Sequence, residues 1–160
     1  MAQEMNAAHG MYHMVSFSVG SERFGVDILT VREIIRMVEI TRIPKAPEYV
    51  EGVINLRGKV IPIVDFRKRF NMEEDPDGNN RDRRIIVGAI GETTVGLVVD
   101  QVSHVIKLGG EEVSPAPPAV KGFDSAFIKG VGRLKEGLLI ILALEKLFSH
   151  CQLQAMELAA

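Results

Sequence analysis

Apolar and polar residues alternate through the first part of the chain, and this pattern predicts short strands. Residues 15–19 alternate with serines, and residues 24–28 repeat the alternation after a Gly-Ser turn. The apolar positions of residues 31–35 favour a single helical turn, and residues 38–40 favour a third strand. Two prolines then interrupt the pattern, and residues 48–51 fit one further helical turn.

The next stretch reads as a hairpin followed by a short helix, and the rest of the chain is organised around it. Val53–Leu56 and Val60–Val64 are the two predicted strands, with Gly58 supplying the positive φ that a tight turn needs. Because Pro62 has no amide donor, its strand should have an edge or a bulge at that point. Asp65 is a suitable N-cap for the helix.

The chain then repeats itself. Residues 15–36 align without a gap on residues 86–107, a shift of 86 − 15 = 71 places, and the apolar register is kept. Residues 52–70 align on residues 130–148, a shift of 130 − 52 = 78 places, with six identities in 19 positions. Arg57 at the first hairpin tip corresponds to Lys135 at the second. Matching turns and matching apolar register indicate an internal structural repeat.

Each copy supplies about five short strands and a terminal helical turn. Five strands cannot cover both faces as an open sheet, so each set should curl into a small barrel. We therefore expect a mainly β protein with two five-stranded β-barrels, residues 15–70 and 83–150, that pack on each other as one cooperative unit. The polar residues 71–82 form the connecting loop, and residues 1–11 and 151–160 are tails.

Composition narrows the function. The chain has 160 residues and a formal net charge of −2, so a nucleic-acid role has little support. No apolar run approaches the roughly 18 residues of a membrane span, and no signal peptide is visible. The single cysteine, Cys151, rules out an internal disulfide framework and favours the cytoplasm.

Candidate chemistry is sparse. The four histidines, His9, His13, His104 and His150, show no metal-ligand spacing. The segment 75–82 resembles a calcium loop only faintly, because its glycine falls at the fourth position and an arginine would stand beside the metal. We expect no catalytic residues, no metal site and no cofactor. What remains is a binding surface, with Arg57 at a hairpin tip, Lys135 at the equivalent tip and Glu33 in an otherwise apolar segment.

Several segments resemble the chemotaxis coupling proteins, the CheW family of bacteria. In the first half they are Phe24-Gly-Val-Asp-Ile28, Val31-Arg-Glu-Ile-Ile35, Thr41-Arg-Ile-Pro44 and Gly52-Val-Ile-Asn-Leu-Arg-Gly58 through Pro62-Ile-Val-Asp65. In the second half they are Val95-Gly-Leu-Val-Val-Asp100, Pro115-Ala-Pro117 and Leu138-Leu-Ile-Ile-Leu142. The resemblance covers about residues 12–150, which it marks as a single CheW-like domain.

The resemblance implies two SH3-like barrels and a non-catalytic adaptor of chemotaxis signal transduction. Such proteins join the cytoplasmic tip of transmembrane chemoreceptors to the regulatory domain of the histidine kinase CheA. They are cytoplasmic, are recruited to receptor arrays and do not insert into the membrane. Carried over by position, Val31 and Glu33 correspond to kinase-binding residues, and Gly52, Arg57 and Val105 correspond to receptor-binding residues.

Three alternatives remain open at this stage. The chain could be a CheW-like adaptor of another chemosensory array, one that serves gliding or pilus motility. It could be a barrel pair that binds a small ligand or nucleic acid, although the chain has no tryptophan and only two tyrosines for stacking. A hydrolase built on His150 and Cys151 is the third alternative.

Overall fold

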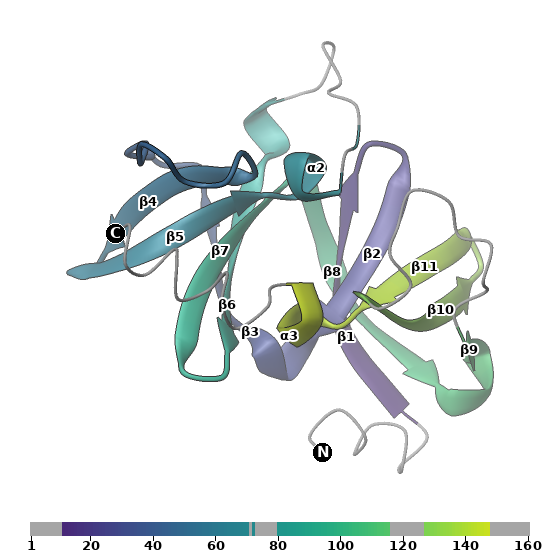
Figure 1. Ribbon diagram of the computed structural model, residues 1–160. Coiled ribbons are helices and arrows are strands. Elements are labelled where there is room, and N and C mark those ends of the chain that lie inside the picture. Colours follow the sequence, from purple (N-terminus) through teal and green to yellow (C-terminus); the bar gives the residue numbers. More distant parts are fainter. Residues whose placement is uncertain (1–10, 71, 73–79, 116–126, 148–160) are drawn as a thin grey trace.

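The computed structural model describes residues 11–70, 72, 80–115 and 127–147, and the protein is mainly β (Figure 1). The strands of the first half are β1 (Met11–Val19), β2 (Glu22–Asp27), β3 (Val31–Arg36), β4 (Val50–Leu56) and β5 (Lys59–Asp65). Those of the second half are β6 (Arg84–Ile90), β7 (Thr93–Val99), β8 (Gln101–Gly109), β9 (Val113–Ser114), β10 (Ile128–Leu134) and β11 (Gly137–Leu142). The helices are η1 (Ile28–Thr30), α2 (Phe66–Arg69), η2 (Asn80–Asp82), η3 (Gly110–Glu112) and α3 (Leu144–Leu147).

The strands form two sheets, which lie side by side in Figure 1 and which we call barrel A and barrel B. Barrel A has the strand order β8-β1-β2-β11-β10-β9, and barrel B has the order β3-β6-β7-β5-β4. In each, the chain that follows the first strand of the order (β8 or β3) turns back and pairs at the far end of the sheet, with β10 or β4. Ser114 of β9 pairs with Val131 in barrel A, and Thr41 pairs with Val53 in barrel B. These pairings close the curl of each sheet.

The two sequence halves exchange strands, so the predicted division into barrels 15–70 and 83–150 is wrong. Barrel A joins β1 and β2 of the first half to β8–β11 of the second, and barrel B joins β6 and β7 to β3–β5. Under the repeat, β1 corresponds to β6, β2 to β7, β3 to β8, β4 to β10 and β5 to β11. Five strands of barrel A therefore match the five of barrel B in order, and β9 has only the isolated Thr41 bridge as its counterpart. The repeat is real, but each barrel is completed by strands from the other copy.

The exchange uses an equivalent parallel pairing in both barrels. Ile141 of β11 pairs with Gly25 of β2, and Ile63 of β5 pairs with Gly96 of β7. Both glycines stand where a side chain would collide with its neighbours. A Cβ at Gly96 would lie 2.5 Å from Ile63 Cδ1, and one at Gly25 would lie 3.0 Å from a Leu139 methyl group. The glycines therefore let the exchanged strands approach closely.

The core has three parts. One small cluster fills barrel B, built from Ile54, Ile61, Ile63, Ile85, Val87 and Val98. Another fills barrel A, built from Met14, Ile106, Leu108, Leu139 and Ile141. The largest lies between the barrels and draws residues from both sheets. The rings of Phe17, Phe24, Phe66 and Phe70 contact one another within it, at centroid distances of 4.6–5.6 Å. This shared core joins the two barrels into one packed body.

The predicted hairpin 52–70 is confirmed, with strands β4 and β5 and helix α2. The carboxylate of Asp65 accepts hydrogen bonds from the N–H groups of Arg67 and Lys68, which makes it the N-cap of α2. Pro62 lies beyond the end of the pairing between β5 and β7, which begins at Ile63. The pairing between β5 and β7 therefore does not need an amide donor at Pro62.

Three local predictions are wrong. Residues 31–35 belong to strand β3, because three of the five are β-branched and pair with β6; the helical turn lies just before them, at η1. Residues 38–40 form no strand, and the chain makes only the isolated Thr41 bridge to β4. Residues 48–51 form no helix: residues 48 and 49 make a turn, in which Val50 N donates to Pro47 O, and β4 begins at Val50. Within the described ranges, no helix is both long and apolar enough to cross a membrane.

Candidate functional site

Two side chains that the sequence singled out bind each other across the opening of barrel B. Glu33 lies on the end strand β3, and Arg57 lies in the turn between β4 and β5. Arg57 Nη1 is 2.6 Å from Glu33 Oε2, and Arg57 Nη2 is 2.7 Å from Glu33 Oε1. This two-point geometry fixes orientation as well as distance. The pair therefore links one end strand to the hairpin that carries the other.

The pair is open to solvent. The Arg57 side chain is 71% exposed and that of Glu33 is 28% exposed. The hydrogen bonds from Arg57 lower the pKa of Glu33, and the same bonds raise the pKa of Arg57. Both groups are thus charged at neutral pH. Because salt screens exposed charges, the pair shapes the surface more than it stabilises the fold.

The turn that carries Arg57 is held in a fixed conformation. Arg57 has φ of 52° and Gly58 has φ of 84°, the combination of a tight hairpin turn whose two central residues are left-handed. The side chain of Asn55 accepts a hydrogen bond of 2.8 Å from the Gly58 N–H. Asn55 therefore holds the turn, and the turn places the Arg57 guanidinium against Glu33 on β3.

Gly52 lies at the closure of barrel B and is buried. Its φ is +149°, and a Cβ there would fall 2.1 Å from the carbonyl oxygen of Thr41. Gly130, its equivalent in barrel A, approaches Ser114 O in the same way, at 2.8 Å. The absence of a side chain at Gly52 thus allows Thr41 to pair with β4. Because Gly52 is buried, a substitution there would affect partner binding by disturbing this pairing, not by removing a direct contact.

The remaining two predicted residues lie on end strands. Val31 is half-buried on β3 and packs against the shared core. Val105 is 48% exposed on β8, the end strand of barrel A. The structure thus brings Glu33 and Arg57 into contact, places Val31 against the shared core and Gly52 at the closure of barrel B, and places Val105 on the other barrel.

Exposed apolar residues recur at equivalent positions of the repeat. Ile34 on β3, 40% exposed, corresponds to Val105 (105 − 71 = 34). Val60 and Leu138, 49% and 63% exposed, correspond to each other beside the hairpin tips (138 − 78 = 60). Sequence reasoning missed Ile34, Val60 and Leu138 as surface residues, although the alignment with Val105 was a signal for Ile34. Such residues suit contact with another protein.

The described residues supply no cluster of three His, Cys, Asp or Glu side chains that could hold a metal ion. His104 is exposed on β8, and His13 is half-buried on β1. The hypothetical His150–Cys151 pair and most of the faint calcium loop 75–82 lie outside the described residues. Two small barrels that share one core and carry surface ion pairs and apolar side chains define a β-barrel binding module.

Comparison with known proteins identifies which module this is. The chain belongs to the CheW-like domain family, whose model matches residues 13–152. It is 39% identical over 135 residues to the chemotaxis protein CheW of Klebsiella aerogenes, covering 83% of this chain and 79% of that protein. It is 34% identical over 145 residues to CheW of Treponema pallidum, covering 89% and 85%.

A crystal structure of the scaffolding protein TtCheW from Thermoanaerobacter tengcongensis superimposes on the chain with a TM-score of 0.79 and 40% identity. The match covers 86% of this chain and 92% of that one. The predicted pair of SH3-like β-barrels and the predicted family are thereby confirmed, and the chain is a CheW-like chemotaxis adaptor.

Proposed function

We propose that this protein couples chemoreceptors to the histidine kinase CheA, binding the cytoplasmic receptor tip with one part of its surface and the regulatory domain of the kinase with another. It does so as a scaffold, without catalysing a reaction. It works in the cytoplasm, where receptors recruit it to their arrays at the membrane.

The observation that carries the proposal is the ion pair between Glu33 and Arg57. Resemblance assigns Glu33, with Val31, to the kinase and Arg57, with Gly52 and Val105, to the receptor. The Glu33 carboxylate accepts both hydrogen bonds from the Arg57 guanidinium, so a residue proposed for one partner contacts a residue proposed for the other. We propose that a partner that engages either residue acts on the position of the other.

The accessible chemistry supports protein partners. Arg57 keeps 71% of its side chain exposed, and a guanidinium presents donors that a partner carboxylate can share. Ile34 follows Glu33 on β3 and is 40% exposed, and its side chain points to the opposite face of the strand. β3 thus carries an exposed apolar side chain as well as the ion pair, and both kinds of group occur at interfaces between proteins.

Separate binding measurements test the two halves of the proposal. The purified protein is titrated into the CheA regulatory domain and, independently, into a receptor cytoplasmic fragment, by calorimetry. We expect saturable binding to both. Arg57→Glu should weaken receptor binding at least about tenfold, as expected for the loss of one charge-assisted contact, while circular dichroism remains unchanged. Unaltered receptor affinity in a folded Arg57→Glu variant would remove Arg57 from the site.

A further inference from the structure

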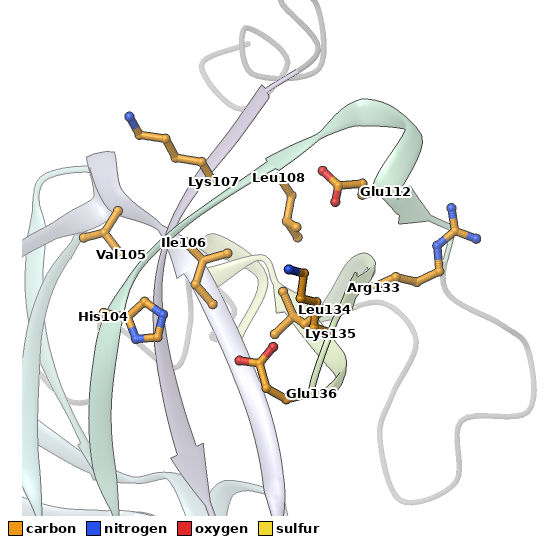
Figure 2. A pocket seen from close by; sticks show the side chains of 10 residues that line it. All are labelled: His104, Val105, Ile106, Lys107, Leu108, Glu112, Arg133, Leu134, Lys135 and Glu136. Carbon is orange, nitrogen blue, oxygen red and sulfur yellow. The ribbon is translucent and has the colours of Figure 1, made fainter.

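A groove opens in barrel A at the place where barrel B carries its ion pair. Its volume is about 340 Å³, and Figure 2 shows it between β8 on one wall and the β10–β11 turn on the other. Its apolar lining comes from Val105, Ile106, Leu108 and Leu134. The polar lining comes from His104, Lys107, Glu112, Arg133, Lys135 and Glu136.

The repeat explains why this groove is open. His104 is the counterpart of Glu33 (104 − 71 = 33), and Lys135 is the counterpart of Arg57 (135 − 78 = 57). In barrel B these positions carry a carboxylate and a guanidinium, which bind each other across the opening. In barrel A neither side chain is an acid. The cation at the hairpin tip is retained, but the carboxylate that would meet it is missing.

The acidic residues of the groove are already engaged. Glu136 Oε2 lies 3.1 Å from Nη1 of Arg23 on β2, and Glu112 Oε1 accepts a 2.8 Å hydrogen bond from the Gly109 N–H. Lys135 has no carboxylate partner among the described residues, and its ammonium group points into the space between the two walls (Figure 2). The groove therefore has a mostly polar lining with a smaller apolar part, and Lys135 gives it a positive charge that no described carboxylate pairs with.

The walls also favour an extended ligand. β8 is the end strand of its sheet, so one edge of its backbone has no strand beside it in the described structure. Extended segments bind such edges by adding a strand, and their side chains then alternate between the two faces. The five wall residues 104–108 would match a segment of about 16 Å at 3.3 Å per residue.

We infer that this groove binds an extended acidic segment of a partner protein, whose carboxylate pairs with Lys135 as Glu33 pairs with Arg57 in barrel B. Alternate apolar side chains of the segment cover Ile106 and Leu134. The inference rests on the proposed function in one respect, that the protein works by binding other proteins. It adds a second contact surface, which shares only Val105 with the residues already assigned.

The test uses the full chain and a fluorescein-labelled eight-residue peptide of alternating valine and glutamate with blocked ends. The variant His104→Glu/Lys135→Arg builds the ion pair of barrel B into barrel A and should close the groove. Its matched control, His104→Gln/Lys135→Arg, keeps the cation without the carboxylate. Lys59→Glu makes a charge reversal beside the hairpin tip of barrel B and controls for general electrostatic attraction.

We expect saturable binding by fluorescence anisotropy, with amide NMR shifts confined to residues 104–108 and 133–136. Affinity should fall at least about tenfold in the ion-pair variant, because one charge-assisted contact is lost, and should change less than about threefold in both controls. A peptide with lysine in place of glutamate should not bind.

Absence of binding, shifts elsewhere on the protein, or equal affinity in the ion-pair variant and its control would overturn the inference. Binding of phosphatidylserine vesicles but not the peptide would also overturn it, since the groove would then serve a membrane. The receptor and kinase titrations on the same preparations report the proposed function separately. If the protein binds neither receptor nor kinase but the peptide binds at the groove, the inference about the groove is supported and the coupling proposal is wrong.

Discussion

Glu33 and Arg57 lie 24 positions apart in the chain and share two hydrogen bonds, of 2.6 and 2.7 Å, across the opening of barrel B. The pair connects the strand proposed to bind the kinase with the turn proposed to bind the receptor. It is exposed, so its contribution to the stability of the fold is small. We propose that its role is to fix the positions of these two groups relative to each other.

Exchanging the two charges distinguishes the role of the ion pair in bridging barrel B from the role of Arg57 in binding the receptor. Glu33→Arg/Arg57→Glu rebuilds the ion pair with exchanged charges, so the barrel B opening should remain bridged. If a receptor carboxylate binds the guanidinium at position 57, receptor affinity should stay at least about tenfold below that of the unaltered protein, like that of Arg57→Glu alone. Calorimetry measures the receptor affinity of the double variant and of Arg57→Glu. Full recovery of affinity in the double variant would show that receptor binding needs the ion pair and not an arginine at position 57.

Gly52 should be required for folding. In Gly52→Ala the new methyl group would meet the Thr41 carbonyl at 2.1 Å, at a φ of +149° that alanine avoids. We expect a loss of about 2–5 kcal/mol in the free energy of unfolding, measured with urea.

Gly58→Ala is the matched control, because that glycine also has positive φ, +84°, but has no atom within 4 Å of the added group. We expect Gly58→Ala to lower the free energy of unfolding by about 1–2 kcal/mol. Equal losses in the two variants would mean that the close approach of Thr41 is unimportant.

The strand exchange predicts that neither half of the chain folds alone. A fragment of residues 1–72 lacks β6 and β7, to which β3 and β5 pair, and a fragment of residues 73–160 lacks β1 and β2. Each should show no cooperative thermal transition by circular dichroism, whereas an equimolar mixture should recover one. A cooperative transition in the isolated first fragment would contradict the exchanged topology.

Much of this architecture follows from the sequence. The repeat, the barrel pair, the 52–70 hairpin and the unusual status of Glu33 and Arg57 were all predictable, because alternation and turn residues are local signals. The exchange was not, since a repeat shows which strands correspond and not which strands pair. A strand satisfies its hydrogen bonds equally well within its own copy or across copies.

The contact between Glu33 and Arg57 was hidden for a related reason. The apolar spacing of residues 31–35 predicts a helical turn, in which their side chains would spread around an axis. Pairing with β6 makes them a strand instead and sets Glu33 on the face that meets the hairpin tip. Pairing between distant segments decides such cases, and five residues are too few for their own periodicity to reveal it.

Asp100 should give the fold a defined acid sensitivity. Burial tends to raise the pKa of Asp100, but hydrogen bonds from buried Arg67 and from the Gly20 N–H outweigh it, so the pKa is lowered. An acid with a lowered folded pKa stabilises the protein fully above its unfolded pKa, about 3.9. This stabilisation is lost as pH falls through the folded pKa.

Asp100→Asn should therefore lower the free energy of unfolding at pH 7 by about 1–3 kcal/mol. The difference in free energy of unfolding between the variant and the unaltered protein should become smaller once the pH drops below about 4. Urea titrations between pH 2.5 and 7 measure this, with the exposed acid variant Glu22→Gln as control. A gap that stays constant down to the lowest pH would show that the Asp100 charge does not act through Arg67.

Co-sedimentation with all three components tests the central claim most directly. Receptor cytoplasmic fragments assembled on vesicles are mixed with CheA and spun down with and without this protein. The account predicts that CheA reaches the pellet in quantity, with raised autophosphorylation, only when the protein is present, and that Arg57→Glu abolishes the effect. CheA that pellets equally well without the protein, or stays in the supernatant with it, would contradict the claim that this chain joins receptor to kinase.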